Sequence, residues 1–159
     1  ALVVVNANGS PVDPSSGLPW ETAGASFGRP SRAERTALRE AMSGQAQQSL
    51  NTTIGVIATS AALDKAACSK LATVGHDGLA RAIRPAHSMT DGDTIFTLAV
   101  GETELPTESF DAHILALNRL LQAGADVFAA ACTHAVVSAS SIGEAAAWRD
   151  LCPNTLSPC

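Results

Sequence analysis

The sequence has no tyrosine, and phenylalanine and tryptophan together make up only 4% of it. A hydrophobic core must therefore be built mainly from Ala, Val, Leu and Ile, whose compact side chains suit close packing of helices on a sheet. Basic residues are also few: the ten Lys and Arg are scattered, and the formal net charge is −5. No basic stripe offers a footprint for nucleic acid or an anionic lipid surface, so we expect neither partner.

No part of the sequence has the pattern of an export signal. The apolar opening at residues 1–5 lacks a basic flank and is too short for a signal peptide. Charged residues interrupt the apolar stretch at residues 114–137, which argues against a membrane span. The four cysteines are widely spaced and none belongs to a CxxC pair, so reduced thiols are expected. These features predict a cytoplasmic location.

Several catalytic signatures are missing. Neither of the common glycine-rich phosphate-binding loops occurs, and there is no Gly-x-Ser-x-Gly elbow, which excludes the usual nucleotide enzymes and α/β-hydrolases. No HExxH or HxxxH spacing is present either, so the sequence predicts no metal site. We expect no cofactor.

The hydrophobic pattern predicts a single domain of the α/β class, built in layers. Apolar, β-branched runs predict buried strands at residues 1–6 and 53–59, and a further strand is predicted at residues 94–100. Helical spacing predicts helices at residues 31–42, which open with a Ser31/Glu34 capping box, and at residues 63–83, which stop before a proline. Residues 108–135 are predicted to form one long helix or two, and residues 146–151 a short closing element.

The bond between Asn51 and Thr52 is the sharpest candidate for chemistry. A polar segment at residues 44–49 delivers a hydroxyl residue to the start of a predicted strand. Attack of the Thr52 hydroxyl on the Asn51 carbonyl, followed by water, would cut the chain there. The new α-amine of Thr52, with an ordinary pKa of about 7.7–8.0, could then accept the hydroxyl proton. The competing interpretation is an ordinary strand start.

Two carboxylates flank a glycine just before the third predicted strand, at Asp91 and Asp93. Such a pair could hold an ammonium group, orient a hydroxyl or relay a proton. The run is too short for a calcium loop. The alternative is a solvated turn capped by its own aspartates.

Three further side chains are weaker candidates. Asn6 ends the first predicted strand, and its amide could act as an oxyanion donor, although an asparagine there is also typical of a turn. His76 and His87 could serve in acid–base catalysis, because histidine as a residue type titrates near neutrality. We expect both histidines to be structural hydrogen-bonding residues instead.

Several longer runs, in this order, resemble the DmpA-type family of N-terminal-nucleophile hydrolases. The runs are Val3–Asn6, Val12–Trp20, Asn51–Thr59, His76–His87 and Asp91–Thr94. The family includes L-aminopeptidase/D-amidases, β-peptidyl aminopeptidases and the endo-acting nylon-oligomer (6-aminohexanoate oligomer) hydrolase. The resemblance covers nearly the whole chain, and the threonine at the cut and the Asp-Gly-Asp run lean towards the nylon-oligomer hydrolase branch.

The resemblance implies a precursor that cuts itself, a layered α-β-β-α fold and a homo-tetramer. Residues 1–51 would be the C-terminal part of the upstream (α) fragment, and residues 52–159 the downstream (β) fragment, both within one domain. Thr52 would be the nucleophile, Asp91 and Asp93 the catalytic-site aspartates, and Asn6 the oxyanion asparagine.

One departure concerns the N-terminal side. Family members carry a substantial region before the strand that opens this chain, and it supplies a tyrosine and a lysine to the site. The chain has no tyrosine, and its lysines, Lys65 and Lys70, follow the predicted nucleophile. We therefore expect the missing region of the same precursor to be a partner of this chain.

Three functions remain open from the sequence. The first is an amidase that opens 6-aminohexanoate oligomers internally through Thr52. The second is an aminopeptidase or amidase acting on short L-, D- or β-peptides. The third is a non-catalytic scaffold relative that uses the apolar stretch at residues 114–137 for oligomer contacts.

Overall fold

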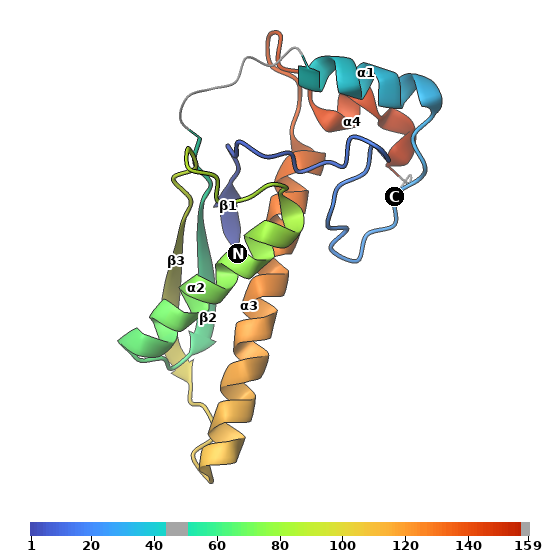
Figure 1. The fold of residues 1–159 in the computed structure, drawn as a ribbon. Helices are drawn as coiled ribbons and strands as arrows, with labels where there is room; N and C mark the ends of the chain where they lie inside the picture. The colour runs from blue at the N-terminus through green and yellow to red at the C-terminus, as the bar shows by residue number, and fades with distance from the viewer. Residues whose placement is uncertain (44–50, 157–159) are drawn as a thin grey trace.

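The computed structural model describes residues 1–43 and 51–156, and it has a mixed α/β fold (Figure 1). The main elements follow in the order β1 (Leu2–Val4), α1 (Arg32–Ser43), β2 (Ile54–Ala61), α2 (Lys65–Ala82), β3 (Thr94–Thr103), α3 (Phe110–Ser138) and α4 (Trp148–Leu151). A single 3-10 turn, η1 (Pro153–Thr155), closes the described chain.

The described strands form a three-stranded sheet in the order β1-β2-β3. β1 pairs antiparallel with β2, so that Val3 lies opposite Gly55, and β2 pairs parallel with β3 from Ile54 opposite Thr94 onward. The parallel connection between β2 and β3 is made by α2, as a parallel pair requires a crossover.

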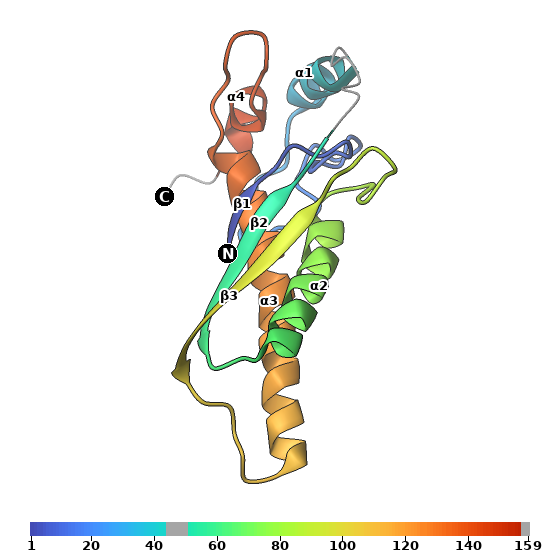
Figure 2. The same cartoon turned by 90° about the vertical axis from the view of Figure 1, so that its left-hand side faces the viewer.

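Helices α2 and α3 pack on the same face of the sheet (Figure 2). Side-chain caps fix their first turns: Asp64 accepts from the Ala67 amide at 2.7 Å, and Ser109 from the Ala112 amide at 3.1 Å. α3 is one unbroken helix, which decides between the two predicted alternatives. A Cβ at Gly78 would collide with the backbone oxygen of Ala125, so glycine lets α2 and α3 approach closely.

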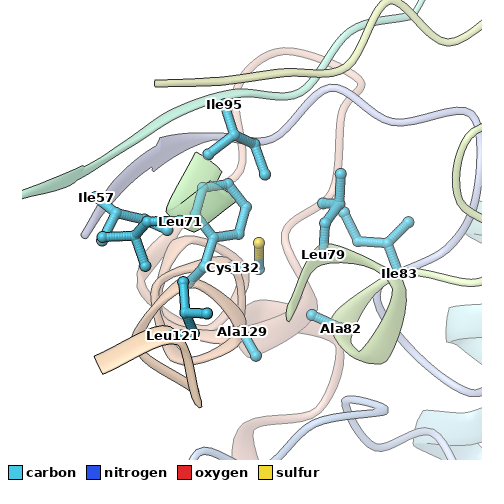
Figure 3. Close-up of a cluster of buried hydrophobic side chains, with 10 residues drawn as sticks. Ile57, Leu71, Leu79, Ala82, Ile83, Ile95, Leu121, Ala129 and Cys132 are labelled. Carbon is cyan, nitrogen blue, oxygen red and sulfur yellow. The ribbon is translucent and has the colours of Figure 1, made fainter. Parts of the chain in front are cut away.

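The main core lies between these helices and the sheet (Figure 3). Leu71 and Leu79 come from α2, and Phe128 and Cys132 from α3; each is at most 1% exposed. Ile57 of β2 completes the contact from the sheet side. Aliphatic side chains thus dominate this core, as the scarcity of aromatics predicted.

A second, smaller cluster joins α1, α4 and the N-terminal loop. Leu38 and Trp148 are buried in it, and the Trp148 indole donates to the Gly17 carbonyl at 2.8 Å. The predicted capping box is confirmed: the Ser31 amide donates to Glu34 at 2.7 Å, and the Glu34 amide donates to the Ser31 hydroxyl at 3.2 Å.

The prediction that the strands at residues 1–6 and 53–59 are buried is wrong for this structure. β1 covers only Leu2–Val4 of the predicted residues 1–6, and the strands alternate between buried and exposed positions. No described helix lies over the second face of the sheet, which is nevertheless apolar. Its exposed side chains include Leu2, Val4, Ile54, Phe96, Leu98 and Val100. Apolar residues on both faces gave the continuous runs that we interpreted as burial.

The described cysteines are free, as expected, whereas the expectation about membranes stays untested. Cys68, Cys132 and Cys152 are free thiols, and Cys159 lies outside the described residues. Within the described chain, α3 is long and apolar enough to cross a membrane, by length and composition alone. A core helix has the same composition, and α3 packs on α2 and the sheet. That the protein avoids membranes stays a prediction.

Candidate active site

The Asn51–Thr52 peptide lies where the chain enters β2, beside the loop that precedes β3 (Figure 1). Backbone hydrogen bonds hold it there: the Asn51 amide donates to the Thr90 carbonyl at 3.1 Å, and the Gly92 amide donates to the Asn51 carbonyl at 2.8 Å. Asn51 is only 8% exposed. The predicted cleavage point is therefore an ordered peptide at the end of the sheet.

Thr52 contacts its own preceding carbonyl. Its hydroxyl donates to the Asn51 carbonyl oxygen at 2.7 Å, and its amide donates to the Asn6 carbonyl at 2.8 Å. The hydroxyl thus lies against the carbonyl group that it would attack, while the Asn6 carbonyl, just beyond β1, holds the nitrogen that would leave. An ordinary strand start does not require the contact between the hydroxyl and the Asn51 carbonyl.

Asn6 is close to Thr52 through its backbone rather than its amide. It lies two residues beyond the end of β1, not within the strand as predicted. Its side chain is exposed and has no hydrogen-bond partner among residues 1–43 and 51–156. Its role as an oxyanion donor remains a prediction.

Asp91 is anchored by its own loop and by the segment that follows β1. One carboxylate oxygen accepts from the Asn8 amide at 3.0 Å, and the other accepts from the Ser88 amide at 2.9 Å and hydroxyl at 2.8 Å. Partial burial opposes the charge, but these hydrogen bonds outweigh it, so the pKa of Asp91 lies below its ordinary value. Asp91 is therefore a carboxylate at neutral pH.

Asp93 is the more enclosed of the pair, with a side chain only 4% exposed. One of its oxygens accepts from the Thr53 amide at 2.9 Å, next to the predicted nucleophile. The other lies 2.8 Å from Nδ1 of His87. Asp93 is thus held by the backbone next to the cleavage point, and Asp91 by Ser88 of its own turn and by Asn8.

His76 and His87 belong to this neighbourhood. Their rings lie 4.9 Å apart, and His87 links the pair to Asp93. Burial, reinforced by the nearby His87, lowers the pKa of His76 below its ordinary value. We predicted both as structural hydrogen-bonding residues. The contact between His87 and Asp93 could not be predicted from the sequence, because it depends on the loop conformation.

Two buried oxygen atoms beside the cleavage point have no hydrogen-bond partner in the described chain: Asn51 Oδ1 and Thr53 Oγ1. Unpaired buried polar atoms are uncommon and cost about 1–3 kcal/mol each. In the same part of the chain, no group of three His, Cys, Asp or Glu side chains could hold a metal ion.

The chain is similar to known proteins of one family. The model of the family described as Peptidase family S58 matches residues 1–147. An uncharacterized aminopeptidase of Mycobacterium tuberculosis is 42% identical over 96% of this chain and 47% of its own length. One from Mycobacterium leprae is 48% identical over 65% of this chain and 29% of its own length.

A further similarity is shorter. A 6-aminohexanoate-oligomer endohydrolase of Kocuria sp. is 37% identical over 38% of this chain and 17% of its own length. The chain spans about half the length of the mycobacterial relative that matches 96% of it. Because the family model covers most of the chain, the chain belongs to peptidase family S58.

Proposed function

We propose that this chain forms part of a self-processing amide hydrolase that cuts its own Asn51–Thr52 bond and then uses Thr52 as an N-terminal nucleophile. The contact that carries the proposal is the one between the Thr52 hydroxyl and the Asn51 carbonyl oxygen, at 2.7 Å. Membership of a peptidase family supports it.

Self-processing would proceed by an acyl shift. The Thr52 oxygen attacks the Asn51 carbonyl carbon, the bond from that carbon to the Thr52 nitrogen breaks, and the hydroxyl proton passes to the departing nitrogen. Water then hydrolyses the ester, which releases the Asn51 carboxylate and restores the Thr52 hydroxyl. The free α-amine becomes the base that activates this hydroxyl for later substrates.

Asp91 and Asp93 would serve the same site from the loop that runs beside the cleavage point. Asp93 reaches the residue after the nucleophile through the Thr53 amide. The Asp91 carboxylate, which is charged at neutral pH, could hold the ammonium group of a substrate's amino terminus. We propose the Asn6 amide as the oxyanion donor toward substrates, because its backbone already contacts Thr52.

The substrate that the relatives support best is a short peptide with a free amino terminus. The mycobacterial relative named as an aminopeptidase matches 96% of the chain, whereas the oligomer endohydrolase matches 38%. Internal hydrolysis of 6-aminohexanoate oligomers, towards which the Asp-Gly-Asp run leaned, is the second candidate. A scaffold without activity explains neither the Thr52 contact nor the anchored aspartates.

We also propose that a second sheet, from a region outside this chain, covers the exposed apolar face of β1, β2 and β3. Phe96, Leu98 and Val100 are each more than half exposed on that face. A monomeric protein rarely leaves such a contiguous face open. This would give the layered α-β-β-α fold, and we propose a homo-tetrameric, cytoplasmic enzyme on the family resemblance.

The decisive experiment is intact mass measurement and N-terminal sequencing of the complete gene product that contains this chain. A fragment that begins Thr52-Thr53-Ile54 is the expected result. Thr52→Val removes the hydroxyl at nearly constant shape and should leave the chain uncut. Thr53→Val is the matched control: it removes the neighbouring hydroxyl, which is fully buried and unpaired in the described chain, and should still be cut.

Substrate choice needs a separate assay on the cleaved protein. Peptides and 6-aminohexanoate oligomers of defined length are compared with free and with acetylated amino termini. Stepwise loss of terminal residues that requires a free amine supports the aminopeptidase. Internal cuts that tolerate acetylation support the oligomer hydrolase. An intact precursor after long incubation of folded protein would contradict self-processing altogether.

A further inference from the structure

Gly92 is the residue of the Asp-Gly-Asp run that touches the cleavage point directly. Its amide donates to the Asn51 carbonyl oxygen at 2.8 Å. A Cβ at this position would lie 3.0 Å from the Thr52 hydroxyl oxygen and 3.7 Å from the Asn51 oxygen. Gly92 therefore lies against both reacting groups of the proposed self-cleavage.

The chemistry of the acyl shift needs a donor at this point. When the Thr52 oxygen attacks, the electron pair of the Asn51 carbonyl moves onto its oxygen, which becomes an oxyanion. The hydrogen bond from the Thr52 hydroxyl is lost in the same step, because that oxygen becomes bonded to the carbonyl carbon. Among the described residues, the Gly92 amide is the donor that still points at the Asn51 oxygen.

We propose that the backbone amide of Gly92 is the oxyanion donor of the self-cleavage step, an inference that rests on the proposed self-processing function. A donor at 2.7–3.1 Å from the developing oxyanion is worth roughly 10²–10³-fold in rate. The amide stabilises the tetrahedral intermediate while the proton of the Thr52 hydroxyl passes to the departing Thr52 nitrogen.

The neighbouring aspartates make this donor rigid. Asp91 is bound to the Asn8 and Ser88 amides, and Asp93 to the Thr53 amide. Gly92 is thus fixed from both sides, and the aspartates act on self-cleavage as positioning residues. A preorganised donor does not need to reorient when charge develops, which is the condition for a large rate effect.

The competing explanation is that the hydrogen bond from the Gly92 amide to the Asn51 carbonyl only extends the parallel pairing of β2 with β3. The same ladder offers a matched control, because the Thr94 amide donates to the Thr53 carbonyl at 2.9 Å, one residue beyond the cleavage point. Removing either amide removes one backbone hydrogen bond of the parallel pair. Only the Gly92 amide, however, contacts the carbonyl that is cut.

The test replaces Gly92, and separately Thr94, by its α-hydroxy acid counterpart in the complete gene product, which exchanges the N–H for an ester oxygen. Self-cleavage of folded material is followed by intact mass. The expected result is roughly 10²–10³-fold slower cutting for the Gly92 replacement, with the Thr94 replacement close to wild type. Gly92→Ala keeps the amide and should cut faster than the Gly92 ester despite the crowded hydroxyl.

Equal rates for the Gly92 ester and wild type, or equal slowing by both esters, would overturn the proposal. So would a Gly92 ester that alone fails to fold, since the amide would then be a structural requirement. If wild-type protein never yields the fragment that begins at Thr52, the proposed function itself fails, before any variant is compared.

Discussion

His87 and Asp93 form a close pair: Nδ1 of the imidazole lies 2.8 Å from a carboxylate oxygen whose side chain is 4% exposed. The pair lies on a loop where His87 adopts a left-handed backbone conformation, with φ of 57°. Asp93 in turn holds the Thr53 amide, so His87 is connected to the residue that follows the proposed nucleophile.

The first prediction removes the imidazole without straining this backbone. Asparagine tolerates the left-handed region, so His87→Asn shortens the side chain and leaves the loop intact. Self-cleavage and substrate hydrolysis should slow by about tenfold, because the Asp93 carboxylate loses the contact that orients it beside the Thr53 amide.

Met89→Ala is the control for this variant, since Met89 lies in the same loop and is fully exposed. It should not change the rate. A His87→Asn protein with the wild-type rate would show that the pair has no part in the reaction.

The second prediction concerns the charge on Asp91. Its folded-state pKa is below the ordinary value of 3.8, so its contribution to stability is present above that pH and is lost as pH falls through the lower, folded-state pKa. Asp91→Asn should lower the free energy of unfolding by about 1–2 kcal/mol at pH 7, because charge-assisted hydrogen bonds from Asn8 and Ser88 are weakened. The difference in free energy of unfolding between wild type and Asp91→Asn should disappear in strongly acidic buffer.

Asp150 provides a comparison far from the cleavage point in sequence and contacts. Its carboxylate accepts from the Ser141 amide and hydroxyl, and these bonds lower its pKa in the same way. Asp150→Asn should share the acid-dependent stability change without slowing self-cleavage. Equal slowing by both variants would mean that Asp91 acts only through overall stability.

The sequence allowed the local features to be predicted because they depend on neighbours. The Ser31/Glu34 capping box, the stop before Pro85 and the helix after Ser109 each rest on residues within a turn of one another. The Asp-Gly-Asp run was found as a motif for the same reason.

The partners of that run could not be predicted. Asp91 binds Asn8, which is 83 positions away, and Asp93 binds Thr53, which is 40 positions away. Such pairs depend on strand register, which the hydrophobic pattern fixes only when one face is polar. Here both faces of the strands are apolar, so neither register nor burial followed from the pattern.

The third prediction concerns His76, whose ring lies beside that of His87. Burial lowers the pKa of His76, so the neutral ring favours folding and this stability is lost as pH falls below about 6.5, through the depressed pKa. The free energy of unfolding of wild-type protein should therefore fall more steeply between pH 7 and pH 5 than that of His76→Gln. Denaturant titrations across this range measure the slope. Parallel slopes for the two proteins would contradict the prediction.

The last prediction tests the close contact of α2 and α3 that supports the sheet under the site. A Cβ at Gly78 would collide with the backbone of Ala125, whereas one at Gly75 would lie 2.9 Å from the flexible end of Ile57. Both glycines are inside α2, so both alanine variants gain the same helix propensity, about 1 kcal/mol. Gly78→Ala should still lose about 1–3 kcal/mol of stability, because two backbones must separate. Gly75→Ala should lose less, because a side-chain end can move by a few tenths of an ångström.

Melting temperatures of the two proteins check the order, and a Gly78→Ala protein at least as stable as Gly75→Ala would show that the helices can part without cost. A destabilised Gly78→Ala protein that still cuts at Thr52 would further show that the loop contacts, rather than the helix layer, hold the cleavage point in place.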